Sequence, residues 1–220
     1  MTFLNSVKNQ SNKLSDPFLH WEFNEPLTEK MIDEIYNTQI DDPTRYEINY
    51  DGTRAIDGGD GNFREGISDG GKALKFRCFL EKHNAKQFPE LFSLVQELQS
   101  KDTHEYISSL IGKDLSKSYV RLEVICDRKG FWLKPHCDIK EKLLSCLLFA
   151  NRFGESEELG TDFYNSKLEL AKTVPYKNNY GYFFSSDENS WHGMEKKEIQ
   201  KDRRSIQINY VTFKTDWPVL

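Results

Sequence analysis

The C-terminal half of the sequence alternates apolar and polar residues, in a pattern that begins at Ser118. A period of two is typical of β-strands with one buried face. The alternating segments follow one another closely, and no helical pattern lies between them. Such a series predicts an antiparallel barrel or sandwich. The expected strands cover residues 119–125, 143–150, 161–164, 168–174, 181–185 and 205–213.

The N-terminal half is expected to support this sheet with helices. Phe18, Leu19, Trp21 and Phe23 suggest a short strand, and residues 24–29 then open a helix. The apolar positions of that helix fall on one face, at Met31, Ile32 and Ile35. Two more helices are expected over residues 89–98 and 105–111, the second ending at Gly112. Residues 1–16 are mostly polar and are expected to be flexible.

Residues 51–71 hold seven of the thirteen glycines and are expected to form a loop too long for a simple turn. Loops of this length are often binding loops or lids. A solvated, mobile loop and a substrate lid are equally compatible with the composition. Arg54 and Arg64 lie within it, and they favour weakly an anionic small substrate.

The composition limits the class of protein. The 220 residues suit one domain, and aromatic residues (13%) make up over a third of the hydrophobic fraction (37%), so a folded chain with a ring-rich core is expected. A net charge of −5 provides no global positive field for nucleic acid. No apolar run approaches the roughly 18 residues of a membrane span. The first residues lack the apolar centre of a secretory signal, so a cytoplasmic location is expected. The four cysteines form no C-x-x-C pair and are expected to be reduced and mostly buried.

A candidate metal site comes from two stretches of the strand-rich half. His136 and Asp138 are two residues apart, so their side chains would point the same way on an extended chain. His192 would complete a triad on one face of an octahedral metal ion, an arrangement that leaves positions open in non-haem Fe(II) oxygenases. The alternative is a hydrogen-bonded surface pair and an unrelated histidine. Cys137 would face away from the metal.

A candidate anion site lies on the last strand, at Arg203-Arg204-Ser205. Arg203 and Ser205 would share a face, and a guanidinium beside a hydroxyl suits the carboxylate of a small diacid. Arg204 would point to the opposite face, and a register error of one residue would exchange the two arginines. Arg203 as a plain surface charge is the other possibility.

These motifs, in this order, resemble the Fe(II)- and 2-oxoglutarate-dependent dioxygenases, in particular their prolyl-hydroxylase-like branch. The segments that carry the resemblance are residues 135–138 (PHCD), 191–193 (WHG) and 203–210 (RRSIQINY). Residues 17–27 (PFLHWEFNEPL) and 159–164 (LGTDFY) support it, although Thr161 stands where the family often has a second glycine. Residues 51–115 match nothing specific in the family.

The resemblance implies a mostly β fold with flanking helices, whose core is a double-stranded β-helix (a cupin-like jelly roll). The core would occupy residues 118–214 of a single domain spanning residues 1–220. It implies iron bound by His136, Asp138 and His192, and 2-oxoglutarate bound by Arg203 and Ser205. By strand parity, Ser145, Leu147 and Phe149 would share a face and line the cosubstrate pocket. Lys140 and Lys142 are expected to be solvated charges. Tyr119, Cys126, Trp132 and Trp191 are expected mainly to pack.

The implied reaction is hydroxylation of a substrate by molecular oxygen, coupled to decarboxylation of 2-oxoglutarate to succinate and CO2. Family members that halogenate lack a carboxylate at the position of Asp138, so the presence of Asp138 favours hydroxylation or desaturation. Three functions stay open: a hydroxylase of a small molecule, favoured by the arginines of residues 51–71; a peptidyl, prolyl-type hydroxylase; and a cupin-like metal-binding barrel without 2-oxoglutarate chemistry. The third would not need Arg203.

Overall fold

The computed structural model describes residues 2–38 and 75–220. Within these ranges, the α-helices are α1 (Phe3–Gln10), α2 (Glu29–Asn37), α6 (Pro89–Gln99) and α7 (Lys101–Ile111). The strands are β1 (Ser11–Leu14), β2 (His20–Asn24), β3 (Lys75–Phe79), β4 (Tyr119–Asp127), β5 (Leu133–His136), β6 (Lys142–Phe149), β7 (Thr161–Tyr164), β8 (Leu170–Val174), β9 (Tyr180–Ser185), β10 (His192–Met194), β11 (Arg203–Val211) and β12 (Trp217–Pro218).

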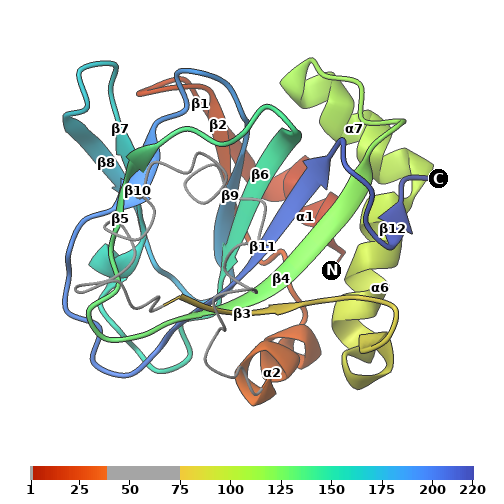
Figure 1. The fold of residues 1–220 in the computed structure, drawn as a ribbon, viewed down its shortest axis with the longest axis horizontal. Helices are drawn as coiled ribbons and strands as arrows, with labels where there is room; N and C mark the ends of the chain where they lie inside the picture. The colour runs from red at the N-terminus through yellow and green to blue at the C-terminus, as the bar shows by residue number, and fades with distance from the viewer. Residues whose placement is uncertain (1, 39–74) are drawn as a thin grey trace.

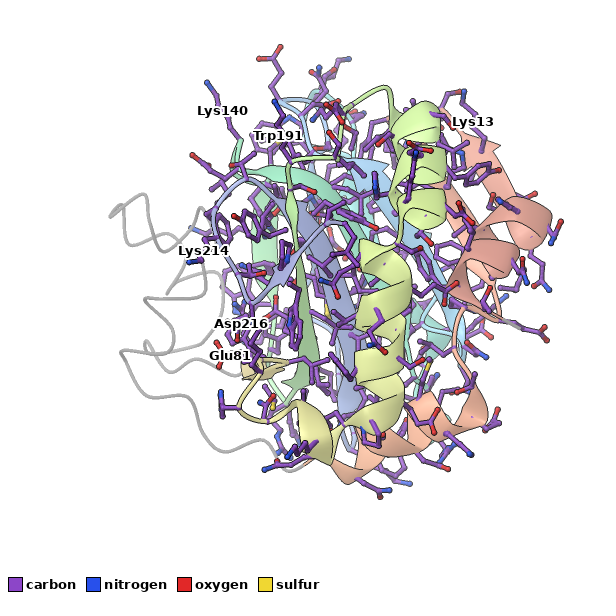
Figure 2. The ribbon with its side chains drawn as sticks, turned by 90° about the vertical axis from the view of Figure 1, so that its right-hand side faces the viewer. Lys13, Glu81, Lys140, Trp191, Lys214 and Asp216 are labelled. Carbon is purple, nitrogen blue, oxygen red and sulfur yellow. The ribbon has the colours of Figure 1, made fainter. Side chains whose placement is uncertain are left out.

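The described strands form two antiparallel sheets. The large sheet has eight strands in the order β1-β2-β9-β6-β11-β4-β12, with β3 also paired to β4, and the small sheet has four in the order β5-β10-β7-β8. The helices α6 and α7 lie on one side of the large sheet and the small sheet lies on the other, as Figure 1 shows. Figure 2, a view onto the helical side, shows the same two helices covering the large sheet. The expected fold, a jelly roll with flanking helices, is confirmed.

Two apolar clusters hold these layers together. The first lies between the large sheet and the helices; alternate residues of β4 and β11, such as Leu122, Val124 and Ile208, contribute to it. The second lies between the two sheets and is rich in aromatic rings. Its members are Phe18, Phe131, Phe149, Leu159, Phe163, Val174, Tyr176, Tyr182, Phe184, Met194 and Ile199. Seven of its eleven members are aromatic, whereas the helix-side cluster combines its rings with a larger number of aliphatic side chains.

Local signals in the sequence account for the start of α2 and the end of α7. The Thr28 side chain accepts a hydrogen bond from the Met31 backbone N–H at 3.2 Å and so caps α2. The predicted end of a helix at Gly112 is confirmed, because α7 stops at Ile111 and Gly112 has a φ of 70°. Only a glycine takes this left-handed conformation without steric cost.

The expected flexibility of residues 1–16 is wrong for residues 3–14. Phe3 and Val7 of α1 are buried in the helix-side cluster, and the backbone N–H groups of Phe3 and Leu4 donate to the Glu97 carboxylate at 3.2 and 2.9 Å. The strand β1 then pairs with β2. A polar sequence conceals this order because only one narrow face of α1 packs against the protein. Residues 51–71, with Arg54 and Arg64, lie outside the described residues.

All four cysteines are free thiols, and Cys126, Cys137 and Cys146 are buried, as expected. Among residues 2–38 and 75–220, none of the helices combines the length and the apolar character that a membrane span requires.

A buried polar network joins the two sheets near their edge. Glu22 of β2 accepts hydrogen bonds from Lys172 of β8, from Tyr180 of β9 and, at 3.1 Å, from the neighbouring His20 ring. Burial alone would raise the pKa of Glu22, but the hydrogen bonds from His20, Lys172 and Tyr180 lower it to about 2. Glu22 therefore remains a carboxylate that ties the small sheet to the large one.

We expect Glu22→Gln to destabilise the protein in a pH-dependent way. The folded-state pKa of about 2 lies below the ordinary value of 4.5, so the stabilisation is complete above pH 4.5 and is lost as the pH falls toward 2. At pH 7 the variant should lose about 3 kcal/mol of unfolding free energy, and this difference should shrink below pH 4.5. Urea unfolding at several pH values measures it, with the exposed Glu158→Gln as the control. A loss that does not change with pH would contradict this explanation.

Candidate metal centre

Three side chains that are distant in sequence converge between the small sheet and β6. His136 is the last residue of β5 and His192 the first of β10, and the register pairs them directly across the two strands. Asp138 follows in the turn that leads to β6. One ligand atom from each of the three residues lies within 4.8 Å of the others. The structure thus brings together the three residues that the sequence pattern predicts as metal ligands.

The two imidazole rings are held in the same way. The Nδ1 atom of His136 hydrogen-bonds to the Lys134 carbonyl at 2.9 Å, and that of His192 to the Ser190 carbonyl at 2.8 Å. A carbonyl accepts from an N–H, so these contacts place the ring proton on Nδ1 and leave Nε2 as the nitrogen of each ring that can coordinate a metal. The Nε2 of His192 lies 3.9 Å from the Asp138 Oδ2, and the two ring centroids are 4.4 Å apart.

The electrostatics of the site favour the protonation states that bind a cation. Burial, together with the neighbouring His192 ring, lowers the pKa of His136 to about 3, so this ring is neutral at physiological pH. Burial acts against the Asp138 carboxylate, but the charge of Lys142 and the contacts of the histidines and Ser145 hold its pKa well below the ordinary range. Neutral imidazole and ionised carboxylate are the forms that coordinate metals.

The donor set fits a divalent transition metal such as Fe(II). Two imidazole nitrogens and one carboxylate oxygen, all on one side, are the facial triad typical of non-haem iron oxygenases. His20 does not belong to this site, because its Nδ1 contacts the Phe18 carbonyl and its Nε2 contacts Glu22. As expected, the Cys137 thiol is turned away and donates to the Glu188 carbonyl at 3.4 Å.

A pocket between the sheets contains the triad and extends to Arg203 on β11. The Nε of Arg203 donates to the Leu159 carbonyl, and its Nη1 donates to Asp127. The guanidinium lies 5.2 Å from the centroid of the Phe149 ring and 5.6 Å from that of Tyr176. These contacts fix the plane of the guanidinium at the wall of the pocket.

The adjacent Arg204 lies on the opposite face of β11, as strand parity predicts. Its Nη1 donates to the carbonyls of Ile35 and Thr38, at 3.2 and 3.0 Å. These carbonyls belong to the C-terminal end of α2, where a positive charge is favourable. Arg204 therefore joins a helix to the sheet and does not line the pocket.

The other residues predicted to bind the cosubstrate differ in their placement. Ser145 and Leu147 line the pocket, but the Ser145 hydroxyl donates to the Asp138 Oδ2. Phe149 is fully buried beneath the Arg203 guanidinium. Ser205 is also fully buried, and its hydroxyl has no hydrogen-bond partner among the described residues.

Sequence reasoning is wrong about Lys142 and overlooks Arg77. Lys142, expected to be a solvated charge, is 2% exposed in its side chain, lines the pocket and contacts Asp138. Lys140 is exposed, as expected, and Figure 2 shows it projecting from the surface. Arg77 of β3 lines the pocket too, with its Nε 3.6 Å from the Glu123 Oε2. No motif marks Arg77, because only the pairing of β3 with β4 brings it to the site.

Solved structures share this fold. A prolyl hydroxylase from Trichoplax adhaerens, in complex with a peptide fragment of the hypoxia inducible factor oxygen degradation domain, matches with a TM-score of 0.54 and 14% identity, over 96% of this chain and 88% of that chain. A prolyl 4-hydroxylase from Phytophthora capsici matches with a TM-score of 0.54 and 15% identity, over 90% of this chain and 60% of that chain. No protein-family model and no curated protein matches the sequence. The chain thus shares the fold of these prolyl hydroxylases and has a His-Asp-His triad.

We expect His136→Ala and His192→Ala each to weaken binding of Mn(II) or Co(II) by more than about 100-fold, which exceeds the usual effect of losing an outer-shell partner. Each variant removes one of three ligands that the backbone has already positioned. Isothermal titration calorimetry measures the dissociation constants. His83→Ala is the control, because the His83 side chain is 74% exposed and lies outside the triad. Equal affinity in the ligand variants and the control would exclude this centre as the metal site.

Proposed function

We propose that the protein is an Fe(II)- and 2-oxoglutarate-dependent dioxygenase that hydroxylates its substrate and releases succinate and CO2. The observation that carries the proposal is the presence of the metal triad and of a fixed, buried arginine in one pocket. A metal-binding barrel without 2-oxoglutarate chemistry would have no use for Arg203 in this position.

The chain's own residues divide the work in this proposal. His136, Asp138 and His192 would hold the iron, which when bound supplies the redox chemistry with molecular oxygen. Arg203 would bind the distal carboxylate of 2-oxoglutarate through the N–H groups that Leu159 and Asp127 do not use. The rings of Phe131, Tyr182 and Phe184 line the pocket between the sheets and would exclude water from it.

The Asp138 carboxylate bears on the type of reaction. Its oxygen would serve as a ligand to the iron, in the place that a halide takes in relatives that halogenate. With the carboxylate present and held by Lys142 and Ser145, hydroxylation is the outcome that the site favours.

We expect Arg203→Lys to raise the KM for 2-oxoglutarate about 10-fold or more, because lysine keeps the charge but loses the planar fork that binds a carboxylate. Succinate release at several 2-oxoglutarate concentrations, with Fe(II) and ascorbate, measures it. Arg204→Lys is the matched comparison: it should lower the Tm through its contacts with α2 and leave this KM unchanged. Failure of the wild-type protein to release succinate would refute the proposed function, and a shift in KM for Arg204→Lys alone would exchange the two roles.

For the substrate, we propose a proline-containing peptide. The Trichoplax adhaerens protein of the same fold is a prolyl hydroxylase with a bound peptide, and the alignment covers 96% of this chain. A small acidic molecule is the second candidate, and Arg77 favours it, because this side chain places a guanidinium on the pocket wall.

A screen of both classes decides between them. Proline-containing peptides should stimulate succinate release and gain one oxygen atom, as mass spectrometry detects. Free amino acids and other small carboxylic acids should have less effect. Oxygen transfer confined to the free acids, and lost in Arg77→Gln, would instead support the second candidate.

A further inference from the structure

We propose that Lys142 is a positioning residue for the metal ligand Asp138: its ammonium group holds the Oδ1 atom of the carboxylate, so that Oδ2 alone faces the ion. The inference rests on the proposed metal centre, and it adds to that centre a residue that no ligand motif contains. Lys142 itself would not touch the metal.

The contacts around the carboxylate assign different roles to its two oxygens. The Lys142 Nζ lies 2.9 Å from Oδ1. Oδ2 accepts the Ser145 hydroxyl and lies 3.9 Å from the His192 Nε2. Oδ2 is therefore the oxygen turned toward the histidines, and Oδ1 is the oxygen turned toward the lysine. Outer-shell contacts of this kind orient a ligand before the metal arrives.

The burial of this pair separates it from an ordinary surface salt bridge. The side chains of Lys142 and Asp138 are 2% and 4% exposed. Exposed pairs contribute little to stability, whereas a buried lysine without a partner is strongly unfavourable. Among the described residues, the ammonium group of this buried lysine therefore has the proposed metal ligand as its hydrogen-bond partner.

A break in the regular strand pairing directs Lys142 into the pocket. Along β6, Ser145 and Leu147 face the pocket, and strict alternation would place Leu143 there next. The register between β6 and β11 shifts between Tyr210 and Val211, so that Val211 pairs with Lys142. Irregularities of this kind re-aim single side chains next to active sites.

The consequence concerns the coordination positions left for other ligands. If both oxygens of Asp138 were free, the carboxylate could chelate the ion through both and occupy a position that a bidentate cosubstrate or oxygen needs. With Oδ1 bound to Lys142, Asp138 contributes one oxygen. The facial triad then keeps its opposite face open.

The test compares Lys142→Met, Lys142→Arg and Lys140→Met, with Co(II) as the probe of the apo protein. Lys140 is the matched control, because it lies two residues away and is exposed (Figure 2). Calorimetry gives the Co(II) dissociation constant, and visible absorption reports the number of ligands on Co(II). We expect Lys142→Met to weaken Co(II) binding about 10- to 100-fold and to change the spectrum. Lys142→Arg, which can still donate to Oδ1, should recover most of both properties.

The outcomes are separable. An unchanged or tighter Co(II) affinity in Lys142→Met, with an unchanged spectrum, would overturn the role of Lys142, since removing a nearby positive charge alone would favour the cation. Thermal unfolding of the apo protein shows whether Lys142→Met is folded. If it is not, the comparison of Lys142→Arg with Lys140→Met decides. A wild-type spectrum and affinity in Lys142→Arg would support the role, and loss of both in this variant would overturn it. Co(II) binding without 2-oxoglutarate turnover would refute the proposed function alone. Absence of Co(II) binding by the wild-type protein would overturn both.

Discussion

The antiparallel pairing of β5 with β10 is the contact on which the site depends. It places His136 and His192 opposite each other, and β10 pairs on its other side with β7, at Phe163. A side chain at Gly193 would bring a Cβ within 2.6 Å of the Leu133 carbonyl oxygen. Only glycine at this position permits the two short strands to approach so closely. The residue that follows a metal ligand is thus a condition for the ligand's position.

Charged side chains line the pocket between the sheets, together with aromatic rings and with aliphatic and neutral polar side chains. On the inner face of the large sheet, Arg203 pairs with Asp127 and Lys142 with Asp138, all four nearly or fully buried. Buried ion pairs of this kind add little to stability compared with apolar packing. The presence of these pairs is better explained by the side chain that each one holds in place. One pair holds an arginine at the pocket wall, and the other holds a carboxylate beside two histidines. Part of the ring-rich composition belongs to the cluster between the sheets, where seven of eleven members are aromatic.

Strands with several apolar positions could be predicted from the sequence, and strands with one apolar position could not. β4, β6, β7, β9 and β11 follow the predicted pattern within a few residues, and the predicted strand 168–174 begins at Leu170. β5 and β10, which carry both histidines, have the sequences LKPH and HGM, so each offers one apolar residue and no visible period. The triad was accessible only as a motif, and its convergence depends on these strands. α1 escaped prediction because Phe3 and Val7 alone reveal its buried face.

Arg203, Arg204 and Lys142 show how far side-chain parity can be trusted. β11 is paired on both sides: Arg203 to Val211 along β4, and Ser205 to Val211 along β6. A slip of one residue would break both ladders and turn the strand's apolar face toward the pocket. The register is therefore specified twice where the arginines lie, and the parity prediction that separates Arg203 from Arg204 agrees with their contacts. It fails at Lys142, where the pairing with β11 shifts. The same alternation that locates the candidate cosubstrate arginine thus conceals the lysine beside the metal ligand, because a strand irregularity leaves no signal in the hydrophobic pattern.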